Sequence, residues 1–181
     1  MIVPGSIFPD FKTLACVSIE QDKEFKEVAS TDYAGKWLVL YTYPKDFTFV
    51  CPTEIAEFDH KLDAFKQRGA VVLGGSTDNE YSHLAWRKDN DQLRELRHPM
   101  LFVSPAMATA WGILHPTAGV ALRATLIVDP DRIVRFATVN DLDVGRNVDE
   151  VLRVLDGLQT GELVACGWKR GDKTLTQQMN A

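Results

Sequence analysis

The sequence predicts one α/β domain in which helices pack on a mixed β-sheet. Short apolar runs, typical of buried strands, alternate with amphipathic helical patterns along the chain of 181 residues. Farther on, two apolar runs flank the turn Asp129–Arg132, which indicates an antiparallel hairpin. Strands alternating with helices, followed by a hairpin and a final helix, are typical of an α/β sandwich with a mixed sheet.

The expected elements of the first half begin with three short strands, Phe11–Val17, Trp37–Tyr41 and Ala70–Gly74. A helix between the second and third strands is marked by apolar residues at steps of three and four, which are Ile55, Phe58, Leu62 and Phe65. We expect this helix to end at Gly69. Thr77 and Glu80 have the spacing of a capping box and predict a further helix through Lys88.

The expected elements of the second half are a strand at Met100–Val103, a brief helix from Pro105 through Trp111, and hairpin strands at Ala124–Val128 and Ile133–Phe136. A last helix begins at Asn147, has Glu150 in the capping-box position and ends at Gly161. We expect residues 1–160 to form the domain. Residues 161–181 are expected to be a mobile C-terminal tail of that same domain.

Composition and charge exclude several classes of protein. The chain is 45% hydrophobic and 25% charged, which is ordinary for a soluble protein, and its net charge is −5. General nucleic-acid binding requires a basic face, so we expect no nucleic-acid partner. Residues Met1–Gly5 do not begin a secretory signal, and no apolar run approaches the roughly 20 residues that span a bilayer. We therefore expect a cytoplasmic protein without a membrane partner.

The three cysteines, Cys16, Cys51 and Cys166, are odd in number and far apart, which is a poor disulfide framework. In a reducing cytosol such cysteines are more often catalytic or redox-active than structural. The sequence contains no CxxC pair, no GxGxxG and no P-loop, and its four histidines lack ligand-like spacing. We expect no metal and no bound cofactor.

Cys51 lies where the apolar strand Trp37–Tyr41 passes into the amphipathic helix. Because Pro52 suits the first helical position, we expect Cys51 to be the N-cap, where free backbone N–H groups and the helix dipole favour a thiolate. The alternative is a small buried hydrophobe, as free cysteine often is. The hydroxyl of Thr48, three residues earlier, and the rigid turn that begins at Pro44 favour a reactive thiol.

Arg123 interrupts an apolar run immediately before a predicted strand. Arginine is rarely buried without a partner, so its side chain either extends to the surface or faces an anion such as a thiolate. The spacing alone leaves both interpretations open. Phe47 and Phe49 are aromatic residues that would shield a pocket at Cys51 from water.

Pro44, Thr48 and Cys51 form the pattern PxxxTxxC within Tyr43–Glu54. The sequence resembles the peroxiredoxins in this run and in three others, which are Gly119–Arg123, Val139–Asn147 and Gly167–Lys169. The resemblance covers the whole chain and is greatest to the alkyl hydroperoxide reductase C type of typical 2-Cys peroxiredoxin. It implies a thioredoxin-like fold with a central mixed sheet flanked by helices.

The resemblance also implies roles for individual residues. Cys51 would be the peroxidatic cysteine, and Thr48 and Arg123 would hold the peroxide oxygens. Pro44 would shield the pocket. Two further residues, Glu54 and Arg146, would orient Arg123.

A resolving cysteine is implied in the C-terminal tail. Many relatives carry it four residues before the tail tryptophan, where this chain has Val164; Cys166 lies two residues before Trp168 instead. If the tail is flexible, this offset of at most about 7 Å of chain leaves Cys166 able to pair. The alternative is a one-cysteine peroxidase. Cys16 falls in a predicted strand and is most simply a strand residue without a chemical role.

The activity implied by the resemblance is the reduction of hydrogen peroxide and organic hydroperoxides through a cysteine sulfenic acid and an intersubunit disulfide. The reductant would be thioredoxin, a flavoprotein reductase or a small CxxC partner protein, and the homodimer would assemble into a decamer. A non-enzymatic peroxide sensor or holdase-type chaperone is the alternative from another class. Turnover of peroxide with a thiol reductant separates these, because a sensor is oxidised only once.

Overall fold

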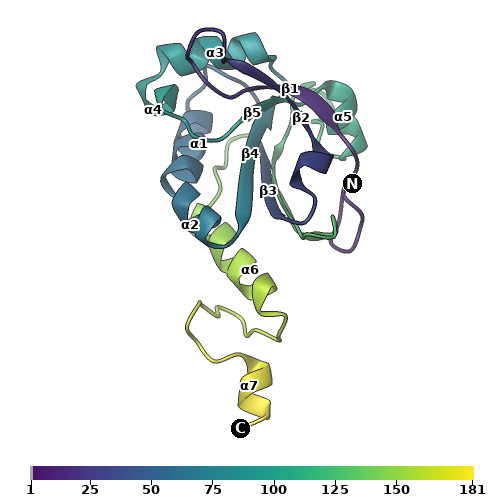
Figure 1. Ribbon diagram of the computed structural model, residues 1–181. Coiled ribbons are helices and arrows are strands. Elements are labelled where there is room, and N and C mark those ends of the chain that lie inside the picture. The colour runs from purple at the N-terminus through teal and green to yellow at the C-terminus, as the bar shows by residue number, and fades with distance from the viewer. Residues whose placement is uncertain (1) are drawn as a thin grey trace. The chain divides into compact units, whose positions relative to one another are not determined.

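A seven-stranded mixed sheet forms the centre of unit 1, the larger of two units into which the chain divides (Figure 1). The structure is a computed structural model that describes residues 2–181, and its units are Met1–Arg146 and Asn147–Ala181. The strand order is β2-β1-β5-β4-β3-β6-β7. The strands are β1 Lys12–Cys16, β2 Phe25–Ala29, β3 Trp37–Thr42, β4 Ala70–Ser76, β5 Met100–Phe102, β6 Arg123–Val128 and β7 Val134–Asn140.

The three central strands β3, β4 and β5 are parallel, and every other neighbouring pair in the sheet is antiparallel. In the middle of β3, Val39 pairs with Val72 of β4 on one side and Ile127 of β6 on the other. The predicted mixed sheet and the hairpin of β6 and β7 are therefore confirmed. Because β3 is paired along both edges, the loop that follows it starts from a fixed point.

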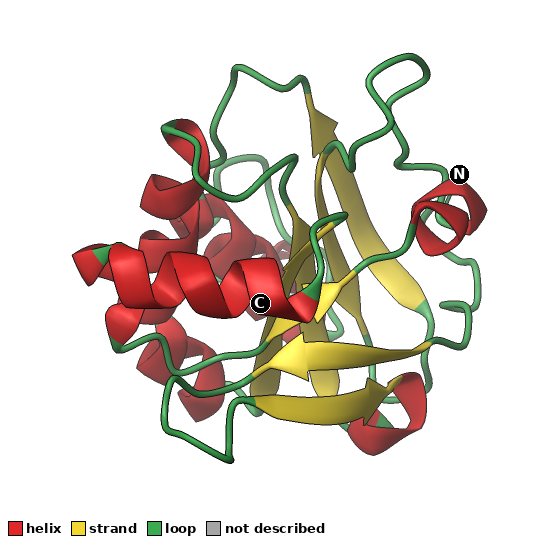
Figure 2. Ribbon diagram, turned by 90° about the horizontal axis from the view of Figure 1, so that it is seen from above, coloured by secondary structure: helices red, strands yellow, loops and turns green. Residues whose placement is uncertain are grey.

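Helices cover both faces of the sheet (Figure 2). The helical segments of unit 1 are η1 Ser30–Tyr33, α1 Val50–His60, α2 Leu62–Gln67, α3 Glu80–Asp89, α4 Asp91–Arg94 and α5 Pro105–Ala110. On the face of α5, Trp111 packs against Phe8 and Phe11 with ring centroids 5.5 and 5.7 Å apart. On the face of α1, Tyr41 stacks on Phe58 at 4.0 Å. Side chains alternate along β3, so this one strand contributes to both cores.

Three local predictions are corrected by the structure. The long helix predicted up to Gly69 is interrupted at Lys61, whose ψ of 3° separates α1 from α2. The N-cap of α3 is Asn79, whose side chain accepts from the Ser82 N–H at 2.9 Å, and Thr77 lies before the cap. Strand β2 was not predicted, because it is short and charged, and its pairing partner β1 supplies the context that the local pattern lacks.

Unit 2 contains α6 Val148–Thr160 and the short α7 Leu175–Met179. The predicted ends of α6 are confirmed: the Asn147 side chain accepts from the Glu150 N–H at 3.2 Å, and Gly161 has the left-handed φ of 65°. Helix α7 was not predicted. The segment between the helices is hydrogen-bonded to α7, since the Leu175 N–H donates to the Leu163 carbonyl at 2.8 Å. Within residues 2–181 no helix is both long and apolar enough to span a bilayer.

Candidate active site

Cys51 is the second residue of α1 and is fully buried. The predicted N-cap position is wrong by two residues: Val50 already belongs to the helix, and Phe49 is the N-cap residue. The sulfur-bearing residue nevertheless lies in the first helical turn, where backbone N–H groups lack helical partners and the dipole is positive. This environment favours a negative charge.

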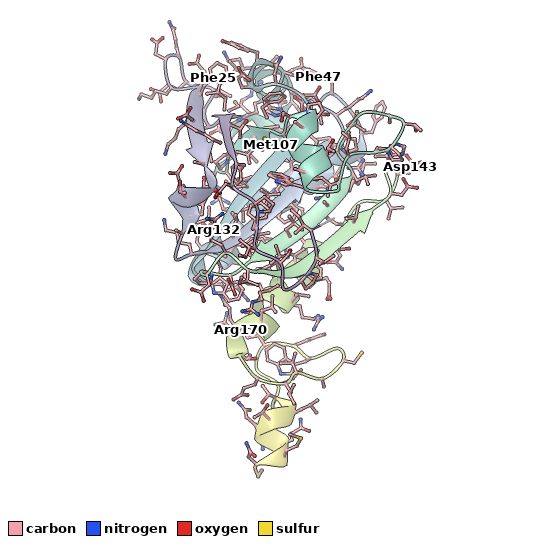
Figure 3. All side chains as sticks on the ribbon, turned by 90° about the vertical axis from the view of Figure 1, so that its right-hand side faces the viewer. Phe25, Phe47, Met107, Arg132, Asp143 and Arg170 are labelled. Carbon is pink, nitrogen blue, oxygen red and sulfur yellow. The ribbon has the colours of Figure 1, made fainter. Side chains whose placement is uncertain are left out.

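A cavity of about 300 Å³ opens at Cys51. It brings together four residues that the sequence analysis singled out, Pro44, Thr48, Cys51 and Arg123. The rest of its wall comes from three segments, and consists of Lys45, Phe49, Val50, Ala118, Val120, Leu142 and Asp143. In Figure 3, Asp143 and Phe47 mark two of the loops in the upper half of unit 1.

The guanidinium of Arg123 lies beside the sulfur. Its Nη1 is 3.4 Å from Sγ of Cys51 and donates to Oε2 of Glu54 at 2.5 Å, while Nε donates to the Leu142 carbonyl at 2.6 Å. Arg123 is only 3% exposed. Of the two interpretations left open by the sequence, the structure places Arg123 inside the protein facing the thiol.

Glu54 joins Arg123 to a second arginine, Arg146. Oε1 of Glu54 accepts from the Nε and backbone N–H of Arg146 at 2.8 and 2.9 Å. Arg146 also donates to the Thr42 carbonyl at 2.6 Å and lies over the ring of Tyr41, 5.3 Å from its centroid. Two buried guanidinium groups thus share one carboxylate. A negative charge on the sulfur balances the remaining positive charge.

Thr48 and Pro44 complete the wall next to the sulfur. The Thr48 hydroxyl donates to the Lys45 carbonyl at 2.9 Å, rather than to the sulfur, as its spacing had suggested. Its proton is therefore engaged, and its oxygen remains an acceptor for a ligand in the cavity. Pro44 is buried and has no N–H, so this part of the wall offers no donor.

The two aromatic residues expected to shield the pocket differ in position. Phe49 lines the cavity but is 93% exposed. Phe47 is about half exposed and packs against Trp86, with ring centroids 6.0 Å apart. Cys51 itself is fully buried, although both phenylalanine side chains are largely exposed.

A polar network behind the cavity loop was missed by the sequence analysis. The Asp46 carboxylate accepts from the Tyr43 hydroxyl and the Ser82 hydroxyl, each at 2.9 Å, and lies 2.8 Å from Nδ1 of His83. All these groups are buried or partly buried. The only sequence signal of this network was a histidine, His83, within the apolar pattern of α3. Helical periodicity alone does not indicate that this histidine contacts Asp46, thirty-seven residues earlier.

Neither Cys16 nor Cys166 is among the residues that line the cavity. Cys16 is fully buried in β1; burial raises the pKa of its thiol, and the neighbouring Arg87 guanidinium opposes that rise. Cys166 belongs to unit 2 and is exposed. It lies in a turn closed by the Trp168 N–H on the Ala165 carbonyl at 3.1 Å, and Gly167 supplies the positive φ of 70°. Among residues 2–181 no cluster of three His, Cys, Asp or Glu residues is arranged to hold a metal.

Comparisons with known proteins all identify the same family. The model of the AhpC/TSA family matches residues 4–137. Alkyl hydroperoxide reductase C of Mycolicibacterium smegmatis is 46% identical, over 97% of this chain and 94% of the relative. A thioredoxin peroxidase of Echinococcus granulosus is 43% identical, over 95% of this chain and 91% of the relative.

Solved structures show the same similarity. AhpC of Mycobacterium tuberculosis superimposes with a TM-score of 0.85 at 41% identity, covering 93% of this chain and 99% of the other. A reduced 2-Cys peroxiredoxin of Plasmodium vivax gives a TM-score of 0.88 at 35% identity, covering 98% of both chains. The similarity in sequence therefore extends to the arrangement of the strands and helices.

Proposed function

This chain belongs to the AhpC/TSA family as a 2-Cys peroxiredoxin and thiol-dependent peroxidase of the alkyl hydroperoxide reductase C type, and we propose that Cys51 is its peroxidatic residue. Its fold is correspondingly thioredoxin-like. The observation that carries the proposal is the Arg123 guanidinium 3.4 Å from a buried sulfur at the base of a cavity. The substrates are hydrogen peroxide and organic hydroperoxides.

Substrate binding follows from the donors and acceptors around the sulfur. A hydroperoxide has one O–H donor and two acceptor oxygens. The Thr48 oxygen, whose own proton is held by Lys45, accepts from the peroxide O–H. Arg123 donates to the peroxide oxygens, and the apolar Pro44 and Val120 exclude water from the O–O bond. This arrangement places the terminal oxygen in front of Sγ of Cys51.

The first step oxidises the sulfur by two electrons. The Cys51 thiolate attacks the terminal oxygen, an S–O bond forms, and the O–O bond breaks. The proton of the terminal oxygen moves to the leaving oxygen, which departs as alcohol or water and leaves a sulfenate. Negative charge spreads from sulfur onto oxygen during this step, so the fixed positive charge of Arg123 stabilises the transition state.

The second step uses Cys166 of another copy of the chain. Its thiol attacks the sulfenic sulfur, a disulfide forms, and water leaves. The exposed position of Cys166 on a turn supports this role. Residues 161–181 act as a mobile tail that brings the thiol to Cys51, and residues 1–160 act as the peroxidase domain. A dithiol protein then reduces the disulfide by exchange and takes up the oxidising equivalents.

The reductant is thioredoxin, a flavoprotein reductase or a small protein with a CxxC pair. The name of the Echinococcus relative, thioredoxin peroxidase, supports the first of these. We place the protein in the cytoplasm, where such reductants keep thiols reduced. The homodimer assembles further into a decamer.

Catalytic turnover tests this assignment. Peroxide consumption is followed with a large excess of peroxide and dithiothreitol over protein, for the wild type, Cys51→Ser and Cys16→Ser. We expect many turnovers in the wild type and in the buried-cysteine control Cys16→Ser, and none in Cys51→Ser. Consumption of only one equivalent by the wild type would favour a peroxide sensor or chaperone. Sustained turnover by Cys51→Ser would contradict the assignment of Cys51.

A further inference from the structure

The peptide between Lys45 and Asp46 connects the cavity to the buried network behind it. Its carbonyl, on Lys45, accepts the proton of the Thr48 hydroxyl at 2.9 Å. Its N–H, on Asp46, donates to Oδ2 of Asp78 at 2.7 Å. Because a peptide unit is planar, the group that fixes the N–H also fixes the direction of the carbonyl. The orientation of the Thr48 hydroxyl thus depends on residues outside the cavity.

The side chain of Asp46 is the second anchor of this peptide. One carboxylate oxygen accepts from the Tyr43 hydroxyl, and the other accepts from Ser82 at 2.9 Å and faces Nδ1 of His83 at 2.8 Å. Asp46 is 7% exposed and His83 is fully buried. Contacts with these three polar side chains fix the buried carboxyl group of Asp46 in position.

Both ring nitrogens of His83 have buried oxygen partners. Nε2 lies 3.1 Å from the Leu101 carbonyl oxygen. Nδ1 lies 2.8 Å from Oδ2 of Asp46. The ring is therefore held between strand β5 and the cavity loop. The nearby cation Arg87, one turn along α3, instead donates to the Leu96 carbonyl at 2.7 Å.

The loop needs such anchoring because it contains a strained residue. Phe47 follows Asp46 and has a φ of 54°, in the left-handed region that residues other than glycine rarely adopt. Its ring contacts Trp86 of α3, the same helix that carries Ser82 and His83. Helix α3 therefore holds the loop at two consecutive residues, Asp46 and Phe47.

We infer that His83 and Asp46 are positioning residues for peroxide reduction, which act by fixing the Lys45 carbonyl and thereby the acceptor oxygen of Thr48. The inference rests on the proposed function of Cys51 and assigns this network a task beyond stability. It does not act on the sulfur, because the charged contact of Cys51 is with Arg123, and Glu54 and the Leu142 carbonyl hold that guanidinium. Peroxide reactivity depends on the network, whereas intrinsic thiol reactivity does not.

Two reactions of Cys51 separate these properties. Hydrogen peroxide requires both the thiolate and Thr48, whereas iodoacetamide requires only an accessible thiolate. In Asp46→Asn and His83→Gln we expect the rate constant with peroxide to fall about 10- to 100-fold, because small misplacement of a positioning group has effects of this size. The alkylation rate should stay within about twofold of wild type, because neither substitution changes the charged contact between Arg123 and Cys51. The matched surface controls Asp131→Asn and His60→Gln should leave both rates unchanged.

Thr48→Val supplies the decisive comparison. If Asp46 acts through Thr48, the double variant Asp46→Asn/Thr48→Val reacts with peroxide no more slowly than Thr48→Val alone. Additive losses would overturn the inference, and so would a wild-type peroxide rate in Asp46→Asn. A fall of both reactions together would show a merely structural role. Ser82→Ala, which removes a single hydrogen bond to Asp46, guards against misfolding and should show the same selective loss to a smaller degree.

Wild type and Cys51→Ser are measured alongside the other variants. Lack of peroxide oxidation in the wild type would refute the proposed function itself, whereas rapid oxidation in both wild type and Asp46→Asn would refute only the positioning role.

Discussion

Nη1 of Arg123 lies 3.4 Å from Sγ of Cys51, and both residues are buried at the base of the same cavity. The same nitrogen donates to the Glu54 carboxylate, so the guanidinium is held in place by a fixed ion pair. A cation fixed in this way needs no reorganisation when charge moves from sulfur to a peroxide oxygen. This relationship is the structural basis of the proposed chemistry.

Replacing Arg123 should slow peroxide reduction more than it disturbs the fold of the site. Arg123→Ala removes the donor next to Cys51, and loss of one such donor typically lowers a rate about 10²- to 10³-fold. Stopped-flow measurement of Cys51 oxidation by hydrogen peroxide tests this. Arg135→Ala, at a half-exposed arginine paired with Asp129, is the control and should react at the wild-type rate. An equal rate in both variants would contradict the role of Arg123.

Glu54→Gln should destabilise the protein strongly. The carboxylate is 3% exposed in its side chain and pairs with both Arg123 and Arg146, so its neutralisation leaves two buried cations without a partner. Loss of one partner of a buried ion pair costs about 3–5 kcal/mol in free energy of unfolding. Urea unfolding measures this cost. Glu57→Gln, farther along α1 and partly exposed, should change stability by less than about 0.5 kcal/mol.

Gly74→Ala should also destabilise unit 1, by overpacking. A Cβ at this position would lie 2.5 Å from the hydroxyl oxygen of Tyr41, which is held by Nε2 of His98 at 2.7 Å. Overpacking of a core costs about 1–3 kcal/mol. Gly157→Ala in α6 is the matched control: its Cβ would lie 3.4 Å from Cγ2 of Val164, and alanine favours a helix over glycine by about 1 kcal/mol. Equal melting temperatures for the two variants would contradict this account of Tyr41.

Asp59 should make stability depend on acidic pH. Partial burial acts to raise the pKa of Asp59, but contacts from His98 and hydrogen bonds from Arg97 outweigh it and lower the pKa from 3.8 to about 2. As the pH falls toward 2, Asp59 binds a proton in the unfolded chain at a higher pH than it does in the folded chain. The free energy of unfolding therefore decreases as the pH falls. Urea unfolding between pH 7 and 2 should show a shallower decline for Asp59→Asn than for wild type. Asp131→Asn should follow the wild-type curve, and a parallel curve for Asp59→Asn would refute the assignment.

The sequence predicted the elements whose signals are local. Strand β3 is a continuous apolar run, α6 has caps at both ends, and the hairpin of β6 and β7 surrounds a turn, and all three are confirmed. Strand β2 and the break at Lys61 were missed because pairing and tertiary packing decide them. The start of α1 was misplaced because Pro52 is also tolerated within the first turn beyond its first position.

The candidate site was predictable only where a short pattern contains its residues. Pro44, Thr48 and Cys51 lie within eight consecutive residues, and the structure places all three on the cavity. The spacing of Arg123 left its role ambiguous because its partner Glu54 lies sixty-nine residues away, and only the family resemblance assigned it to the site. Asp46 and His83 were not singled out, since a buried contact between a loop and a helix has no sequence period.

The most direct test of the central claim is to identify the bond that peroxide creates. The reduced wild-type protein is treated with one equivalent of hydrogen peroxide, blocked with a thiol reagent, separated by non-reducing electrophoresis and mapped by mass spectrometry. We predict a covalent dimer joined between Cys51 of one chain and Cys166 of another, which dithiothreitol reverses. A Cys16–Cys51 disulfide, or sulfenic acid that persists at Cys51 without any link to Cys166, would contradict the two-cysteine mechanism.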